Sequence, residues 1–268
     1  PVYRDTMADY SEIEEKLDAI IGSGEQYFNS LNFPRTQLTF IENKNGDSTR
    51  YGKKGYWCLP NLPARGHGEI RRSVGTAEEW CFVGERVETP FYVVDFADDS
   101  SMRSLYDKEL SREWVDGAFN ERSVNEDKPG VYDAWDILPN YKDRRVAVEV
   151  ATPLHLAEKN DEVAVFETEL KIGQSTWKRL IRLFRLSRGI EVENVVDWRE
   201  KHRLAKAEFS CNVLAREALC DIGAGFIRRE TPKNTSWQQA RFEVCHHQCC
   251  DLAKTDGGYA ALHDCNYG

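Results

Sequence analysis

The chain has 268 residues, of which 41% are hydrophobic and 30% are charged, and its formal net charge is −9 at pH 7. This length and composition are typical of one large globular domain or two smaller ones, and the acidic balance excludes a nucleic-acid partner, which normally requires a basic surface. No run of about 18 apolar residues is present, so we expect no membrane partner, and the polar N-terminus PVYRDTMADY lacks signal-peptide character.

The first predicted element is one amphipathic helix over residues 5–28. Charged residues lie on one face of this helix, and apolar residues recur at helical spacing on the other. The apolar residues are Ile13, Leu17, Ile20, Ile21 and Phe28. Two glycines at positions 22 and 24 mark a break near the end of this helix. A single amphipathic helix needs a partner that buries its apolar stripe, and no second strong helix follows.

From about residue 36 onward the pattern predicts β-strands separated by turns. The strands are expected at residues 38–41, 91–96, 146–150, 163–170, 190–196, 207–214 and 220–226. Residues 177–186 (WKRLIRLFRL) fit either a helix or a long strand with cations on its open face, and residues 42–56 are predicted to form a long exposed loop. Many short strands favour an antiparallel sandwich over alternating βα units.

The eight cysteines are irregularly spaced in a long chain, which favours reduced thiols in a cytoplasmic protein over a disulfide framework. One cluster has residue types suited to zinc: Cys245, His246, His247, Cys249 and Cys250. It follows residues 241–244, which are predicted to form a strand. Because neighbouring side chains on a strand point to opposite faces, His246 and His247 are not expected to share one ion, although a metal site stays an alternative.

Aromatic and acidic residues are interleaved in DKPGVYDAWD, residues 127–136. Sugar sites use aromatic faces against C–H surfaces and carboxylates to hold hydroxyl groups. The structural alternative is that these aromatic residues pack in a β core and that the aspartates sit in turns. No nucleophile elbow and no glycine-rich phosphate loop is present.

Four segments together resemble the region after the catalytic domain in glycoside hydrolase family 38, the α-mannosidases, in its cytosolic and bacterial branch. The segments are SLYDKE at 104–109, EDKPGVYDAWDI at 126–137, VENVVDWREKHRL at 192–204, and NTSW through ARFEV at 234–244 followed by DCNYG at 264–268. The resemblance covers residues 58–268, and extends to the first helix.

The resemblance implies a mainly β fold, a large antiparallel β-sandwich (a supersandwich) over residues 31–268, preceded by one helix of a three-helix bundle over residues 1–30. It implies that zinc and the catalytic carboxylates of the retaining reaction lie in a preceding α/β domain, so this chain has no catalytic residues, no cofactor of its own and is inactive alone. The Pro1 start and the end at Gly268 fit a segment of a longer protein. The expected partners are α-mannoside glycans, the catalytic domain of the parent chain and, as an option, a second copy in a homo-oligomer.

By position, the resemblance assigns substrate contacts to one loop and one turn: Tyr132, Asp133, Trp135, Asp136, Asp264 and Asn266. Three positions depart from the family pattern, since Cys249 stands where tryptophan is usual, His263 where asparagine is usual and Asn266 where lysine is usual. The rival interpretation is a non-enzymatic carbohydrate-binding or scaffold module that uses the same sandwich. Asp197, Trp198 and His202 are expected to form a structural corner.

Overall fold

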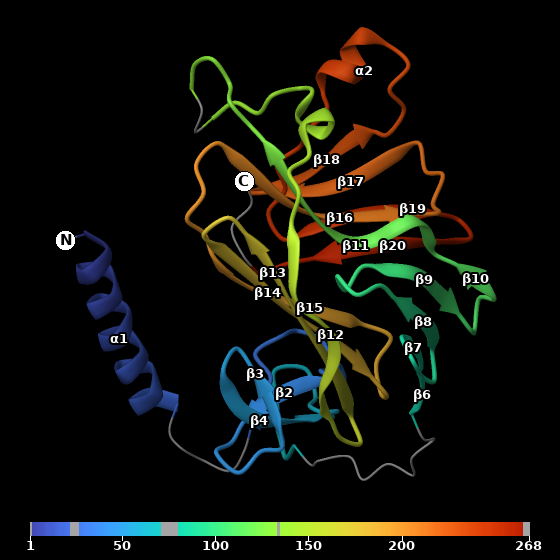
Figure 1. The fold of residues 1–268 in the computed structure, drawn as a ribbon. Coiled ribbons are helices and arrows are strands. Elements are labelled where there is room, and N and C mark those ends of the chain that lie inside the picture. The colour runs from blue at the N-terminus through green and yellow to red at the C-terminus, as the bar shows by residue number, and fades with distance from the viewer. Residues whose placement is uncertain (1, 22–26, 71–79, 133–134, 265–268) are drawn as a thin grey trace. The chain divides into compact units, whose positions relative to one another are not determined.

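The computed structural model of the chain describes residues 2–21, 27–70, 80–132 and 135–264. The chain divides into two compact units, of which unit 1 contains Pro1–Ala77 with Asn160–Val163, and unit 2 contains Glu78–Lys159 with Ala164–Gly268. Strands dominate the fold and pair in antiparallel fashion, so the mainly β architecture predicted from the sequence is confirmed (Figure 1). The predicted domain boundary at residue 30 stays a prediction.

Unit 1 begins with helix α1 (Val2–Ile21), which is shorter than the helix predicted over residues 5–28. Phe28 does not belong to it, but lies in strand β1 (Tyr27–Phe28), which pairs with β5 (His67–Gly68). The physical reason is the pair of glycines at positions 22 and 24, because glycine disfavours helix continuation by about 1 kcal/mol relative to alanine. Neither helix in the described part of the chain has the length and apolar character that a membrane crossing requires.

A three-stranded sheet completes unit 1, in the order β2 (Thr39–Glu42), β4 (Lys53–Cys58), β3 (Ser48–Arg50). The prediction of a long loop over residues 42–56 is therefore wrong. The polar segment contains a hairpin, in which Arg50 pairs with Lys53 across Tyr51 and Gly52. Both turn residues have positive φ, 49° and 74°, as a tight hairpin turn requires, and a polar composition does not prevent strand pairing at an exposed edge.

Unit 2 contains two sheets that form the sandwich and a third, smaller sheet. The seven-stranded sheet consists of β6 (Cys81–Val83), β7 (Arg86–Glu88), β8 (Tyr92–Phe96), β9 (Met102–Asp107), β10 (Arg112–Glu113), β11 (Val115–Glu126) and β16 (Arg203–Cys211). The facing sheet consists of β12 (Glu149–Lys159), β13 (Val163–Ile172), β14 (Ser175–Phe184) and β15 (Ile190–Asp197). The third consists of β17 (Glu217–Ile222), β18 (Gly225–Glu230), β19 (Cys249–Lys254) and β20 (Gly257–Leu262). A short helix α2 (Ser236–Ala240) follows β18, and a 3₁₀ turn η1 (Tyr141–Arg144) precedes β12.

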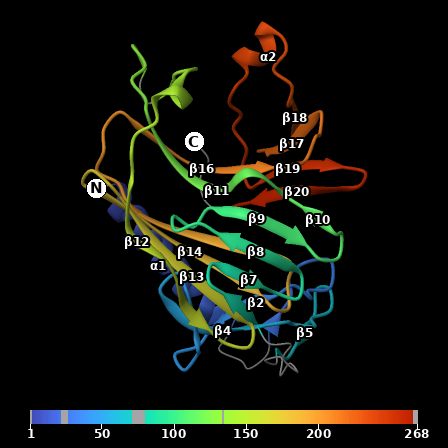
Figure 2. The ribbon, with the colours of Figure 1, turned by 45° about the vertical axis from the view of Figure 1, so that its right-hand side comes forward.

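The main core lies between the seven-stranded sheet and the sheet of β12–β15 (Figure 2). Phe96 and Met102 on the first sheet are fully buried against Phe166, Ile181 and Leu183 on the second. The Phe96 and Phe166 rings lie 5.2 Å apart between centroids. Alternating inward residues of two sheets thus bury one apolar layer, which confirms the predicted β-sandwich.

Residues 177–186 form most of strand β14, so the structure decides between helix and strand. The expectation that the cations of this segment lie on an open face is wrong for Arg179, Arg182 and Arg185, which are at most 7% exposed. Arg182 is neutralised by Glu193, 2.7 Å from its Nη2. Part of the cost of burying Arg179 and Arg182 is offset because a backbone carbonyl accepts from Arg179 and two carboxylates pair with Arg182, contacts that no strand pattern reveals.

One further strand prediction is corrected in the third sheet. Residues 220–226 are not one strand, because the chain turns back after Ile222 and Gly225 begins β18. The hairpin turn consists of a glycine and an alanine at positions 223 and 224. A two-residue turn of this composition is a weak turn signal, so the sequence alone does not divide the two apolar strands.

Candidate functional site

Residues 127–145 leave the sandwich at the end of β11 and return to it at β12. The Asp127 carboxylate accepts a hydrogen bond from the Leu138 backbone N–H at 3.0 Å, which closes the base of the loop. The Asp127 N–H itself donates to the His202 carbonyl at 3.1 Å. The first aspartate of the EDKPGVYDAWDI motif therefore anchors the loop.

The aromatic residues at the tip of this loop are exposed. Tyr132 is 72% exposed and Trp135 is 87% exposed, so the interpretation that they pack in the core is wrong. The Tyr132 carbonyl accepts hydrogen bonds from the N–H groups of Trp135, at 2.7 Å, and Asp136, at 2.8 Å, which places these three residues in one tight turn. Tyr132 has a left-handed φ of 59°, which is uncommon for a bulky side chain. Asp133 lies outside the described residues.

The other predicted contact residues lie on a different element. Asp264 is exposed and follows β20 by two residues, whereas Asn266 lies outside the described residues. His263, which precedes Asp264, is held against the third sheet, because the His263 N–H donates to the Gln248 carbonyl at 2.9 Å. The structure thus brings Tyr132, Trp135 and Asp136 together, and places Asp264 on a separate turn.

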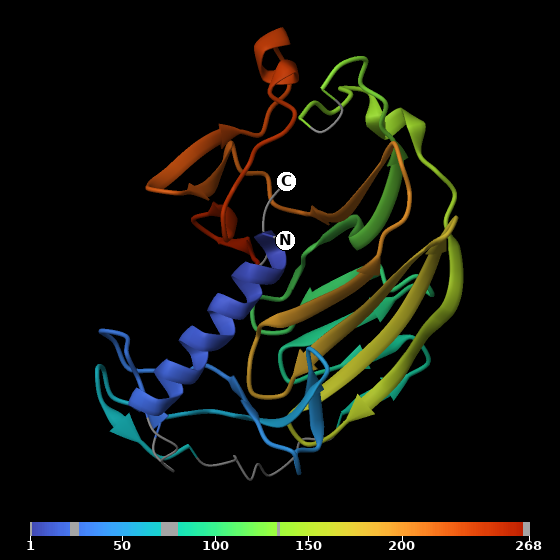
Figure 3. The same ribbon diagram turned by 90° about the vertical axis from the view of Figure 1, so that its left-hand side faces the viewer.

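A third exposed aromatic residue is Trp237 of the NTSW segment, which was not predicted as a site residue from the sequence. It lies on α2 and is 77% exposed. The preceding Thr235 caps this helix, accepting from the Gln238 N–H at 3.2 Å while the Gln238 side chain accepts from the Thr235 N–H. Residues 127–145 and α2 lie at the same end of unit 2 (Figure 3).

A partly buried polar contact joins residues 127–145 to the segment that follows α2. The Tyr141 hydroxyl in η1 donates to Glu243 Oε1 at 3.0 Å, and Lys206 Nζ lies 2.8 Å from Glu243 Oε2. Tyr141 is 3% exposed, and burial, together with the Glu243 charge, raises the pKa of its hydroxyl above its usual value. The contact of Tyr141 with Glu243 therefore anchors the loop that carries Trp135.

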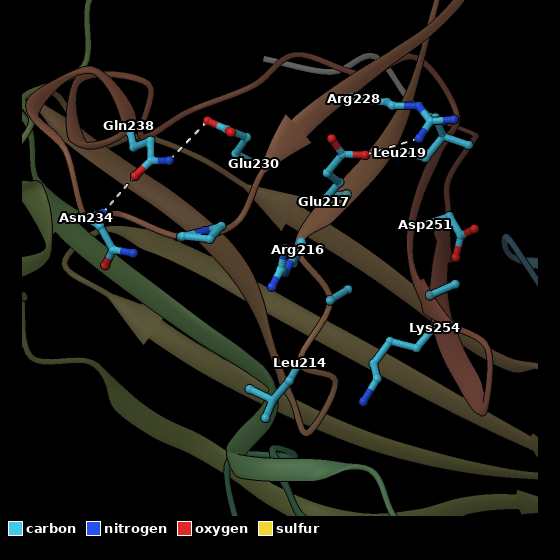
Figure 4. A pocket seen from close by; sticks show the side chains of 14 residues that line it. Leu214, Arg216, Glu217, Leu219, Arg228, Glu230, Asn234, Gln238, Asp251 and Lys254 are labelled. Carbon is cyan, nitrogen blue, oxygen red and sulfur yellow. Dashed lines mark hydrogen bonds and ion pairs between the residues drawn. The ribbon is translucent and has the colours of Figure 1, made fainter.

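A separate open pocket of about 950 Å³ lies on the third sheet (Figure 4). Its lining combines acidic, basic and amide side chains, which are hydrogen-bonding groups suited to hydroxyl-rich ligands. The Arg228 guanidinium lies 3.2 Å from the Glu217 carboxylate, and Gln238 donates to Glu230 at 3.2 Å. The polar members of the lining are Arg216, Glu217, Arg228, Glu230, Asn234, Gln238, Asp251 and Lys254.

The Cys/His cluster follows an irregular segment rather than the predicted strand. Residues 241–244 are not a strand, and β19 begins only at Cys249. His246 does not pair with His247, but its Nδ1 lies 2.9 Å from Nε2 of His263. Within the residues that the structure describes, no group of three or more His, Cys, Asp or Glu side chains is placed to hold a metal ion.

Other motif residues have structural roles. The buried Asp107 of SLYDKE accepts from the N–H groups of Glu109 and Leu110, each at 3.0 Å, and so holds the turn after β9. Glu200 accepts from the Gln174 N–H at 2.9 Å and from the Ser175 hydroxyl at 3.3 Å. Glu200 lies in the segment from Asp197 to His202, which was expected to form a structural corner. Its contacts join the β13–β14 turn to the end of β15.

Comparisons with known proteins agree with the motif analysis. The sequence profile described as glycosyl hydrolases family 38 C-terminal domain matches residues 87–268. Alpha-mannosidase G of Dictyostelium discoideum is 30% identical over 190 residues, which cover 68% of this chain and 17% of that protein. Alpha-mannosidase 2C1 of Homo sapiens is 32% identical over 160 residues, covering 56% of this chain and 14% of that protein. The chain spans less than a fifth of the length of these relatives.

The fold has a solved counterpart as well. The crystal structure of an alpha-mannosidase from Enterococcus faecalis V583 matches with a TM-score of 0.54 at 9% identity, over 92% of this chain and 34% of that one. This likeness shows the fold alone. The profile match, however, extends over more than half of the chain and includes the loop of residues 127–145, α2 and the third sheet. The chain therefore belongs to glycosyl hydrolase family 38, and corresponds to the C-terminal domain of its α-mannosidases.

Proposed function

We propose that this chain is the C-terminal β-domain of an enzyme that hydrolyses terminal α-mannosides, and that its Tyr132–Trp135–Asp136 turn contacts the glycan at the mouth of the active site. The observation that carries the proposal is the exposure of Trp135. Because its ring is 87% exposed, packing in the protein interior does not explain why a tryptophan stands at this position. Aromatic faces offer an apolar platform for sugar C–H surfaces, and the Asp136 carboxylate accepts hydrogen bonds from hydroxyl groups.

Catalysis is assigned in this proposal to the preceding part of the parent enzyme, meaning the full-length α-mannosidase. That part holds the zinc ion and the carboxylates of the retaining reaction, consistent with the small share of the relatives' length that this chain spans. The 268-residue chain alone is then inactive. The described cysteines are unbridged, which supports the proposed cytoplasmic location.

Helix α1 provides the proposed link to that preceding part. Four apolar side chains along one stripe of the helix, Met7, Tyr10, Ile13 and Leu17, are 47–57% exposed. Their spacing of three and four residues is that of a helix that packs against other helices. This stripe supports the proposal that α1 is one helix of a bundle in the parent enzyme.

The test compares Trp135→Ala with Trp237→Ala in the parent enzyme, because both remove an exposed tryptophan. Loss of a stacking platform in Trp135→Ala is expected to raise KM for a chromogenic α-mannoside by roughly 5- to 50-fold with little change in kcat. Trp237→Ala is expected to leave both constants unchanged. An unaltered KM in Trp135→Ala would refute the contact and favour a scaffold role for the loop.

The rival function is a carbohydrate-binding or scaffold module without hydrolysis. Turnover of a chromogenic α-mannoside by the 268-residue chain alone with added zinc would contradict both functions, because it would contradict the assignment of catalysis to the preceding part. Saturable mannoside binding by the chain alone, lost in Trp135→Ala, supports the binding module.

A further inference from the structure

Two thiols of the third sheet face each other across neighbouring strands. Cys220 on β17 and Cys250 on β19 are directly opposite in the antiparallel register, and their Sγ atoms are 3.5 Å apart. Directly opposite residues of an antiparallel pair have Cα atoms about 4.5–5.5 Å apart, within the range of about 4.4–6.8 Å that a disulfide spans. Bond formation needs the sulfur atoms to approach to about 2.05 Å, a shift that side-chain rotation provides.

The register that opposes these thiols is held by the residue next to Cys220. Oδ1 of Asp221 accepts three backbone N–H bonds, from His247 at 3.1 Å, Gln248 at 2.9 Å and Cys249 at 2.8 Å. The segment that leads into β19 is thereby fixed against the end of β17. A slip of one residue would break all three bonds, so Cys250 stays opposite Cys220.

We propose that Cys220 and Cys250 are a redox site that forms a reversible cross-strand disulfide with small-molecule disulfides such as oxidised glutathione. This inference is independent of the proposed function, since it rests on the third sheet alone.

The chemistry proceeds by two exchanges. Cys250 is partly exposed whereas Cys220 is fully buried, so Cys250 meets the reagent first. Its thiolate attacks one sulfur of the small disulfide, forms a mixed disulfide and releases one small thiolate. Cys220 then loses its proton and attacks Cys250 Sγ, forming the protein disulfide and releasing the second small thiolate. Two protein thiols are oxidised by two electrons, and one small disulfide is reduced to two thiols.

The surroundings make this site slow in neutral solution and faster in alkaline solution. Burial, followed by the contact with Cys220 and the charges of Asp251 and Asp221, raises the pKa of the Cys250 thiol to about 12. Only the thiolate attacks a disulfide, so little of the reactive form exists at pH 7. The completed bond encloses β18 and α2 in one covalent loop between β17 and β19.

The experiment treats the reduced 268-residue chain with oxidised glutathione at mildly alkaline pH, blocks the remaining thiols under denaturing conditions and maps the peptides by mass spectrometry. We expect two of the eight thiols to be lost in one linkage between the peptides of Cys220 and Cys250, and to return after dithiothreitol treatment. If both peptides stay blockable while the exposed Cys81 and Cys245 take up glutathione, the site does not exist.

Three variants identify the attacking and the resolving thiol. Cys220→Ser is expected to accumulate a stable glutathione adduct on Cys250, because the resolving thiol is absent. Cys250→Ser is expected to lose the linkage. The matched control is Cys249→Ser, whose side chain points to the other face of β19, and it is expected to retain the linkage. A linkage that disappears in Cys249→Ser overturns the assignment, and the peptide map of the unsubstituted chain decides the matter if a variant fails to fold.

Discussion

Arg122 and Arg179 cross the interior of the sandwich in opposite directions. Arg122 Nη1 on β11 donates to the Trp177 carbonyl on β14 at 2.7 Å, while Arg179 Nη1 on β14 donates to the Asn120 carbonyl on β11. Each guanidinium thus serves the backbone of the sheet opposite to its own. Burial, with the repulsion from Arg122, lowers the pKa of Arg179 to about 9, so the guanidinium stays charged at pH 7.

This exchange predicts that Arg179 matters for stability. Arg179→Ala removes the donor to one buried acceptor, the Asn120 carbonyl, and a second donor to Oδ1 of the exposed Asn194, and it leaves a cavity. We expect the free energy of unfolding in urea to fall by about 2–4 kcal/mol. The neighbouring Lys178→Ala breaks only a half-exposed ion pair with Glu167 and should cost about 1 kcal/mol or less. Equal losses in the two variants would contradict the structural role of Arg179.

The exposed and buried tryptophans should separate function from stability. Trp135→Ala is expected to change the free energy of unfolding by less than about 0.5 kcal/mol, because the ring is 87% exposed. Trp177→Ala removes a ring that is 5% exposed and donates to Asn194 at 2.8 Å, and should cost about 3–5 kcal/mol. Urea unfolding of both variants measures this contrast, and a marked loss in Trp135→Ala would mean that the loop is part of the core.

Acid should destabilise the contact between His246 and His263. Burial, and then the neighbouring His263, lower the pKa of His246 below its usual value of 6.5. The neutral ring is therefore favoured in the folded chain, and its contribution is present above about pH 6.5 and is lost as the pH falls through the lower folded pKa. NMR titration of the His246 ring should show this depressed pKa.

The same contribution appears in stability measured against pH. In His246→Gln, stability should fall less steeply below about pH 6.5 than in the unsubstituted chain, whereas the exposed His155→Gln should follow the unsubstituted chain. A His246 ring that titrates at or above its usual value would contradict the prediction.

Asp221 should control local order at the start of β19. Burial alone raises the pKa of this carboxyl, but the three backbone donors together outweigh burial and hold the pKa below its usual value. The stabilisation is thus present above about pH 4 and is lost as the pH falls further. Asp221→Asn should accelerate hydrogen exchange at the amides of His247, Gln248 and Cys249. Asp251→Asn on the same sheet is the control, and unchanged exchange in Asp221→Asn would show that the three bonds do not hold the segment.

Several roles of motif residues became clear only from their contacts. The EDKPGVYDAWDI segment predicted a loop with sugar-binding residue types, yet its Asp127 closes the loop while its Trp135 is exposed. A sequence pattern treats both as members of one motif. Their roles differ because Asp127 meets a backbone N–H eleven residues later, a contact that depends on the path of the loop.

By itself the sequence determined that this chain is mainly β, which residues form most strands, and to which family its motifs belong. These follow from local alternation of apolar residues and from ordered motifs, which are properties of neighbouring positions. Only the tertiary structure decided that Arg179 is buried, that Cys220 opposes Cys250 and that His246 meets His263. Each of these depends on strand register and on which sheets face each other, since residues far apart in the chain acquire their environment only when packing brings them together.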